Sequence, residues 1–143
     1  MPRVENWHLA LHALIQDRRS MHFAWGRHDC CQFAGAAAAA LTGDGKFTAH
    51  AGKYSTALGA RRYLMTLTGV KDPDAAIYAL PEFFGLQEIN PNLAQRGDIV
   101  AIEQGHHAAL AVVTLDARLL AAPALAGLEF MPREHAMRAW RVG

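Results

Sequence analysis

The sequence lacks the features that would place it in several special classes of protein. It has only two cysteines, which are neighbours at Cys30 and Cys31. Adjacent residues on a regular helix point in different directions, so a disulfide framework is excluded and a reducing compartment is expected. The Arg and Lys residues are scattered and the formal net charge is +1. A nucleic acid is therefore not an expected partner.

Long apolar runs are also missing. No apolar run reaches the roughly 18 residues that a membrane span needs. Within segment 1–16, Arg3, Glu5, His8 and His12 interrupt the apolar pattern, which differs from the continuous apolar core of a signal peptide. We therefore expect cytoplasmic synthesis without a signal peptide, and no membrane span.

Metal ligands are present but poorly arranged. His8 and His12 are spaced by four residues, yet two histidines without a third ligand are more often surface residues. Zinc could in principle take ligands from 28–30 and His107, but neighbouring residues rarely converge on one tetrahedral ion. We expect no metal and no cofactor.

What is present is the composition of an ordinary folded domain. The chain has 143 residues, of which 52% are hydrophobic and 19% are charged. That length can bury a core without disulfides or metals, and the composition is too apolar for a disordered chain. We expect a single domain over 1–143.

The residue pattern changes character along the chain. Apolar periodicity and end signals predict helices over 4–18, 29–41, 56–68 and 75–80, the last ended by Pro81. Beyond about residue 96, short apolar runs separated by turns predict strands over 99–102, 108–113, 119–122, 127–130 and 137–142. Helices followed by strands with short connections indicate an α+β domain, with N-terminal helices packed on a C-terminal antiparallel sheet.

One stretch carries a candidate nucleophile. Segment 23–33, FAWGRHDCCQF, leads into an alanine-rich run, and Asp29 is a favoured N-cap residue, so a helix should begin at Asp29 or Cys30. A thiol in the first turn of a helix faces unpaired N–H groups and the positive end of the helix dipole, which favour the thiolate. The alternative is a buried structural thiol, since free cysteine is among the most buried residue types.

A candidate base lies far away in the sequence. Segment 96–98, Arg-Gly-Asp, turns into one predicted strand, and His106 and His107 open the next. A cysteine nucleophile needs a base within hydrogen-bonding reach. A strand would hold His107 firmly enough to be aimed at a helix terminus, although it could instead cap the strand at the surface. Asp98 is expected to fix its turn rather than to act chemically.

Four motifs together resemble a known superfamily. They are Phe-Ala-Trp-Gly at 23–26, Asp-Cys-Cys at 29–31, Arg-Gly-Asp at 96–98 and His-His-Ala-Ala at 106–109. In order and approximate spacing they resemble motifs of the NlpC/P60 superfamily of papain-like cysteine peptidases and amidases. The run Trp-Gly-x-x-Asp-Cys-Cys-x-Phe-Ala is particularly similar to small members encoded among phage and prophage tail genes. The resemblance covers about 21–123.

The resemblance implies a papain-like NlpC/P60 core and a set of residue roles. Cys30 takes the place of the nucleophile and His107 that of the general base, with Asp29 and Trp25 in neighbouring motif positions. Cys31 falls where the superfamily usually has serine, so it is expected to be structural.

Two positions depart from the superfamily pattern. The polar third residue that orients the histidine aligns with Ala121, which has no polar side-chain atom, and the upstream tyrosine aligns with Phe23. Gln104 or His106 could replace the orienting residue, and both alternatives stay open.

Two functions are consistent with these residues. The first is a cysteine hydrolase that cleaves amide bonds in cell-wall (peptidoglycan) peptides and is associated with a phage or prophage tail, with the virion tail as a location. The second is a catalytically degenerate structural component of a phage tail tip or tail assembly. The expected partner is accordingly a cell-wall peptide substrate or a set of phage tail proteins.

Overall fold

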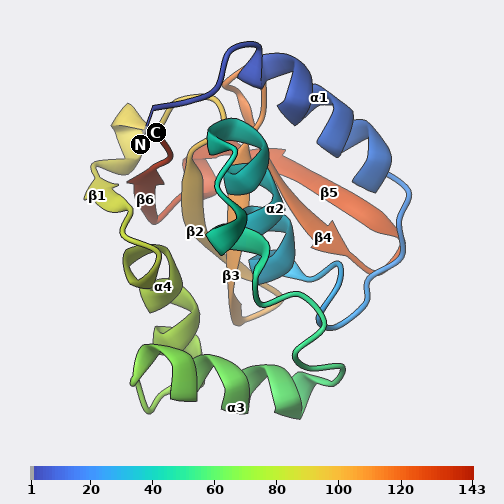
Figure 1. The fold of residues 1–143 in the computed structure, drawn as a ribbon, viewed down its shortest axis with the longest axis vertical. Coiled ribbons are helices and arrows are strands. Elements are labelled where there is room, and N and C mark those ends of the chain that lie inside the picture. Colours follow the sequence, from blue (N-terminus) through green and yellow to red (C-terminus); the bar gives the residue numbers. More distant parts are fainter. Residues whose placement is uncertain (1) are drawn as a thin grey trace.

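The computed structural model describes residues 2–143, and over these residues four α-helices precede a six-stranded antiparallel sheet. The helices are α1 (Trp7–Arg18), α2 (Cys30–Thr42), α3 (Ala57–Thr68) and α4 (Pro73–Phe83). The strands are β1 (Gln87–Ile89), β2 (Ile99–Gln104), β3 (His107–Val113), β4 (Leu119–Ala124), β5 (Gly127–Pro132) and β6 (Arg138–Arg141), in the spatial order β1-β6-β2-β3-β4-β5. The predicted α+β class is confirmed (Figure 1).

Helix α2 is the central helix, and it packs against α1 and the middle strands (Figure 1). Its ends are defined by their caps: Asp29 accepts a hydrogen bond from the Gln32 N–H, and Gly43 adopts a left-handed conformation (φ 72°). Small residues on its buried face allow close packing. At Gly35 an added Cβ would collide with the Phe47 carbonyl oxygen, so glycine is needed there.

The two faces of the sheet bury separate clusters. One of them, the helix-side cluster, packs under the helices and includes Leu11, Phe33, Leu110 and Trp140. The other lies on the opposite face of the strands and consists mainly of small and β-branched residues. Each fully buried large apolar side chain contributes about 1.5–3 kcal/mol. Cys30 packs against both clusters, which places it where the helix layer meets the second face of the sheet.

Strands β3 and β4 separate towards the hairpin that joins β2 to β3. Their pairing comprises Val112 opposite Ala121 and Val113 opposite Leu120. By contrast, β2 and β3 pair over their full lengths, from Ile99 opposite Val112 to Gln104 opposite His107. The end of β3 that carries His107 is therefore not paired to β4.

Several predicted boundaries were wrong. Helix α1 begins at Trp7 rather than residue 4, because Asn6 takes a left-handed conformation (φ 60°) that a helix cannot include. Helix α4 runs through Pro81 to Phe83, since proline has a helical φ and only one N–H is lost in the last turn. No helix or strand is predicted over segment 46–55, yet the side chains of Phe47 and Tyr54 within it are buried.

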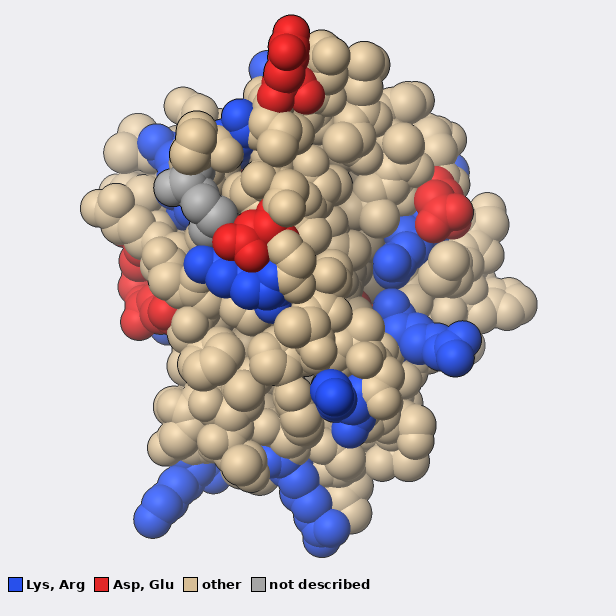
Figure 2. All heavy atoms as spheres, viewed as in Figure 1, with Lys and Arg blue, Asp and Glu red and all other residues tan. Residues whose placement is uncertain are grey.

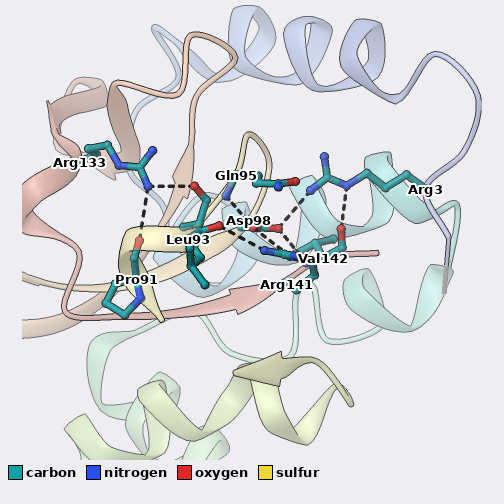
Figure 3. A network of polar contacts seen from close by, with 9 residues as sticks. Arg3, Pro91, Leu93, Gln95, Asp98, Arg133, Arg141 and Val142 are labelled. Atoms are coloured by element: carbon teal, nitrogen blue, oxygen red, sulfur yellow. Dashed lines mark hydrogen bonds and ion pairs between the residues drawn. The ribbon is translucent and has the colours of Figure 1, made fainter. Parts of the chain in front are cut away.

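The predicted turn role of Asp98 agrees with its hydrogen bonds (Figure 3). The buried carboxylate accepts from the Gln95 N–H at 2.8 Å, from the Val142 N–H at 3.0 Å and from Arg3 Nη2 at 3.1 Å. Arg3 also donates to the Val142 carbonyl oxygen at 2.8 Å. Asp98 therefore joins both ends of the chain to the start of β2, and the termini lie close together (Figure 1).

Residues 2–143 contain no helix with the length and apolar character needed to cross a membrane.

Candidate functional site

A cleft of about 310 Å³ brings the two predicted chemical groups together. Cys30, at the first position of α2, and His107, at the first position of β3, both line it. The walls are mostly apolar and come from α3 and α4, including Ala60, Leu64 and Ile77. Within residues 2–143, no hydrogen bond links the side chains of Cys30 and His107. The two side chains thus share a site but are not in direct hydrogen-bonding contact.

Asp29 forms the floor of the cleft beside Cys30. Its carboxylate is 2% exposed and accepts three hydrogen bonds: from the Gln32 N–H at 2.9 Å, the Gly26 N–H at 2.8 Å and the Tyr54 hydroxyl at 2.8 Å. Its charge is therefore stabilised by donors rather than by a cation. The predicted role as N-cap is confirmed.

The first turn of α2, which carries Cys30, has backbone N–H groups without intrahelical partners. The first intrahelical hydrogen bond runs from the Phe33 N–H to the Asp29 carbonyl oxygen at 2.9 Å. The N–H groups of Cys30 and Cys31 precede that bond and belong to the unpaired first turn. They are suited to stabilise negative charge at the N-terminus of α2, either on a thiolate or on a developing oxyanion.

Cys31 is buried in the helix-side cluster, as the 100° step from Cys30 predicts. Its sulfur lies 3.8 Å from the Cys30 sulfur. A hydrogen bond with Cys30 and burial both raise the pKa of the Cys31 thiol well above its ordinary value. Cys31 therefore keeps its proton near neutral pH and can donate a weak hydrogen bond to Cys30.

The β2–β3 hairpin separates the roles of the two neighbouring histidines. Gly105 and His106 both have positive φ angles, 58° and 67°, which is the pattern of a two-residue type I′ turn. His106 is exposed at the tip of this turn and does not line the cleft. His107 lies opposite Gln104 in the register, and both of these side chains line the cleft.

Ala121 does not occupy the position of an orienting residue, and the alignment that put it there needs correction. Val113 pairs with Leu120, so Leu120 and Ala122 share a face of the sheet with His107, Ala109 and Ala111. Ala121 points to the opposite face and is buried in the helix-side cluster. The position on β4 was wrong by one residue, because a shift of one residue in a strand exchanges its two faces.

Trp25 and Phe23 form the rim of the cleft. Trp25 is 41% exposed, and its ring meets that of Phe23 edge to face at a centroid distance of 4.8 Å. Gly26 follows with φ 82°, and an added Cβ there would collide with the Tyr54 carbonyl oxygen. The Trp-Gly pair thus supplies an exposed aromatic ring and a turn that only glycine fits.

Sequence reasoning missed Tyr54, which lies in segment 46–55, where no helix or strand was predicted. The side chain is buried, lines the cleft and donates its hydroxyl hydrogen to Asp29 while accepting from Gln32 Nε2 at 3.2 Å. Burial first, and then the charge of Asp29, raise the pKa of this hydroxyl above its ordinary value. A tyrosine in a polar segment gives no local signal of burial.

His28 is fully buried directly before the N-cap. Its Nδ1 lies 3.1 Å from Arg18 Nη1, and since arginine can only donate, Nδ1 accepts and the proton of the neutral ring resides on Nε2. Burial, followed by the charge of Arg18, lowers the pKa of His28. Within residues 2–143 no group of three or more His, Cys, Asp or Glu side chains is arranged to hold a metal ion.

On the face shown in Figure 2, Asp and Glu lie in the upper half, whereas separate Lys and Arg side chains occur over the whole face without forming a continuous stripe. Two exposed charged side chains line the cleft: Arg61 from α3 and Asp74 from the first turn of α4. The opening of the cleft therefore presents one charge of each sign beside largely apolar walls.

The comparisons with known proteins assign a family but no activity. No curated protein and no solved structure matches the chain. A family model described as a domain of unknown function (DUF6950) matches residues 2–142, nearly the whole chain. The chain therefore belongs to the DUF6950 family.

Proposed function

We propose that this chain is a cysteine hydrolase of the NlpC/P60 kind that cleaves amide bonds in cell-wall peptides and is associated with a phage or prophage tail. The observation that carries the proposal is the shared cleft, in which a helix-terminal cysteine and a strand-borne histidine face the same space. The choice of cell-wall peptides and the tail association rest on the resemblance of the four sequence motifs.

The reaction follows from the groups in the cleft. The Cys30 thiolate attacks the scissile carbonyl carbon, and the backbone N–H of Cys30 stabilises the oxyanion that forms. Protonated His107 gives its proton to the leaving amine as the C–N bond breaks. Water then attacks the acyl-thioester with His107 as base, the C–S bond breaks, and the acid product leaves the regenerated thiolate.

The first test measures hydrolysis of peptidoglycan fragments by mass spectrometry. Wild type should release amine and acid products, and Cys30→Ala should abolish the release. His107→Gln should slow it about a hundredfold or more. His106→Gln is the matched control, since this neighbour is exposed outside the cleft, and it should retain activity. Equal loss in both histidine variants would contradict the assignment of the base.

A second candidate function is a structural tail component with a decayed site. Two observations favour it: no hydrogen bond joins Cys30 to His107 among the described residues, and the β4 residues that share a face with His107 are all apolar, namely Leu120, Ala122 and Ala124.

Alkylation with iodoacetamide at neutral pH separates the two candidates. An activated Cys30 should react at least about tenfold faster than an ordinary exposed thiol, while Cys31 stays protected. A slow Cys30 together with no hydrolysis would favour the structural component.

A further inference from the structure

The side-chain amide of Gln104 has an orientation that its neighbours define. Its Nε2 donates to Glu129 Oε2 at 2.9 Å and to the Pro123 carbonyl oxygen at 3.3 Å. A carboxylate and a carbonyl oxygen can only accept, so the NH₂ group must face them and Oε1 must be turned away from them. Gln104 therefore presents an acceptor oxygen in a fixed direction.

Glu129 lies on the face of the sheet that carries His107. It pairs with Ala122 across β4 and β5, and Ala122 shares that face with His107. The Gln104 side chain reaches from β2 to Glu129 on β5 and to the β4 backbone at Pro123. These hydrogen bonds connect β2 to β4 and β5 in the region where β3 and β4 are not paired.

Gln104 is also the cross-strand neighbour of His107. The two residues are directly opposite in the register, next to the type I′ turn, and both line the cleft. Side chains directly opposite on antiparallel strands have Cβ atoms about 4.5–5.5 Å apart, so they can interact. The other replacement considered from the sequence, His106, is in the exposed turn and outside the cleft.

We propose that Gln104, held by Glu129, is the positioning residue of His107. No hydrogen bond joins Gln104 to His107 among those of residues 2–143. In the proposed arrangement a rotation of the imidazole lets Oε1 of Gln104 accept from one ring N–H, which fixes the tautomer and leaves the other ring nitrogen free to face Cys30. The catalytic consequence rests on the proposed hydrolase function, but the hydrogen bond itself does not. In the NlpC/P60 pattern a polar residue on the strand after the histidine orients the ring. In this chain Gln104 on β2 and Glu129 on β5 take over that role together.

The direct test is NMR of the imidazole nitrogens, whose shifts report the tautomer, with His107 assigned from the spectrum of His107→Gln. The spectra are recorded at about pH 8.5. Wild type should populate one tautomer of His107 over the other by at least about fivefold. Gln104→Leu should reduce that preference to about twofold or less, and Gln87→Leu, a change on the distant strand β1, should leave it unchanged.

A swapped pair guards against a simple folding defect. In the double variant Gln104→Glu, Glu129→Gln, the amide at 129 donates to the carboxylate at 104, whose other oxygen still accepts from His107. The tautomer preference should return to the wild-type value. An identical His107 spectrum in wild type and in folded Gln104→Leu would overturn the proposal, as would a swapped pair that folds but behaves like Gln104→Leu.

Kinetics separate this proposal from the proposed function. On peptidoglycan fragments, Gln104→Leu should lower kcat by about tenfold to a hundredfold with KM nearly unchanged. If no variant hydrolyses the fragments but the His107 spectrum changes as expected, the positioning role stands and the hydrolase function fails. If hydrolysis occurs and the spectrum does not respond to Gln104→Leu, the positioning role fails and the hydrolase function stands.

Discussion

Two buried aspartates at the starts of secondary-structure elements show how differently one side chain can be stabilised. Asp98, before β2, pairs with Arg3 at 3.1 Å and lies 3.6 Å from Arg141 Nε. Asp29, before α2, receives its hydrogen bonds from two N–H groups and the Tyr54 hydroxyl, with no ion pair among the described residues. The first site joins the chain termini, and the second supports the candidate nucleophile without placing a competing cation beside it.

The largest expected effect is at Asp98. Asp98→Asn removes the charge between two arginines and turns an amide NH₂ towards groups that donate. Because the carboxylate is completely buried, we expect a loss of about 3 kcal/mol in the free energy of unfolding, measured by urea denaturation. Asp72→Asn, an exposed helix cap where asparagine serves equally well, is the control and should change stability by less than about 0.5 kcal/mol. Similar losses in both variants would show that the ion pairs of Asp98 contribute little.

The corresponding substitution at Asp29 should lower the free energy of unfolding by less than Asp98→Asn does, because it breaks no ion pair. Asp29→Asn keeps an oxygen for the Gln32 N–H but turns an NH₂ group towards the Gly26 N–H and the Tyr54 hydroxyl, which also donate. We expect a loss of about 2 kcal/mol by the same measurement.

Tyr54→Phe tests the other half of that interaction. This substitution should lower the free energy of unfolding by about 1 kcal/mol in the wild-type chain and by less in the Asp29→Asn variant. Additive losses would mean that the two groups do not interact.

Cys31 provides a smaller effect in the same region. Cys31→Ser places a hydroxyl in the helix-side cluster while keeping a donor near Cys30, so stability should fall by about 1 kcal/mol and hydrolysis should be spared. Thermal unfolding and the peptidoglycan assay measure the two quantities. Loss of hydrolysis at an unchanged melting temperature would instead assign Cys31 a direct role in the reaction.

The smallest effect concerns pH and His28. The pKa of His28 is lowered by burial and then by Arg18, so below its ordinary value of about 6.5 the unfolded chain binds a proton that the folded chain does not. Protonation of His28 should therefore leave the free energy of unfolding unchanged above about pH 6.5 and should lower it as the pH falls below that value.

Unfolding free energies measured from pH 7.5 down to pH 5 in wild type and in His28→Gln test this assignment. Wild type should lose stability more steeply than the variant. Parallel curves would show that His28 does not contribute to the acid dependence.

The elements with strong local signals were predictable from the sequence. Asp29 and Gly43 define the ends of α2 through hydrogen bonds between near neighbours, and the short apolar runs of β2 and β3, bounded by turn residues, identified strands whose pairing follows from a two-residue turn. These features depend on short-range chemistry, so a single sequence contains them. The short strand β1 was missed because three residues, two of them exposed, carry no recognisable period.

The sequence by itself determined that Cys30 begins a helix, that His107 begins a strand, and that Asp29 caps, because each of these rests on residues within a few positions of one another. Only the tertiary structure decided what faces them. Tyr54 reaches Asp29 from 25 residues away, Gln104 reaches Glu129 across the same separation, and Ala121 faces away from His107. Such contacts depend on register and on how the sheet is arranged against the helices, where a shift of one residue reverses a side chain, and no local pattern records that choice.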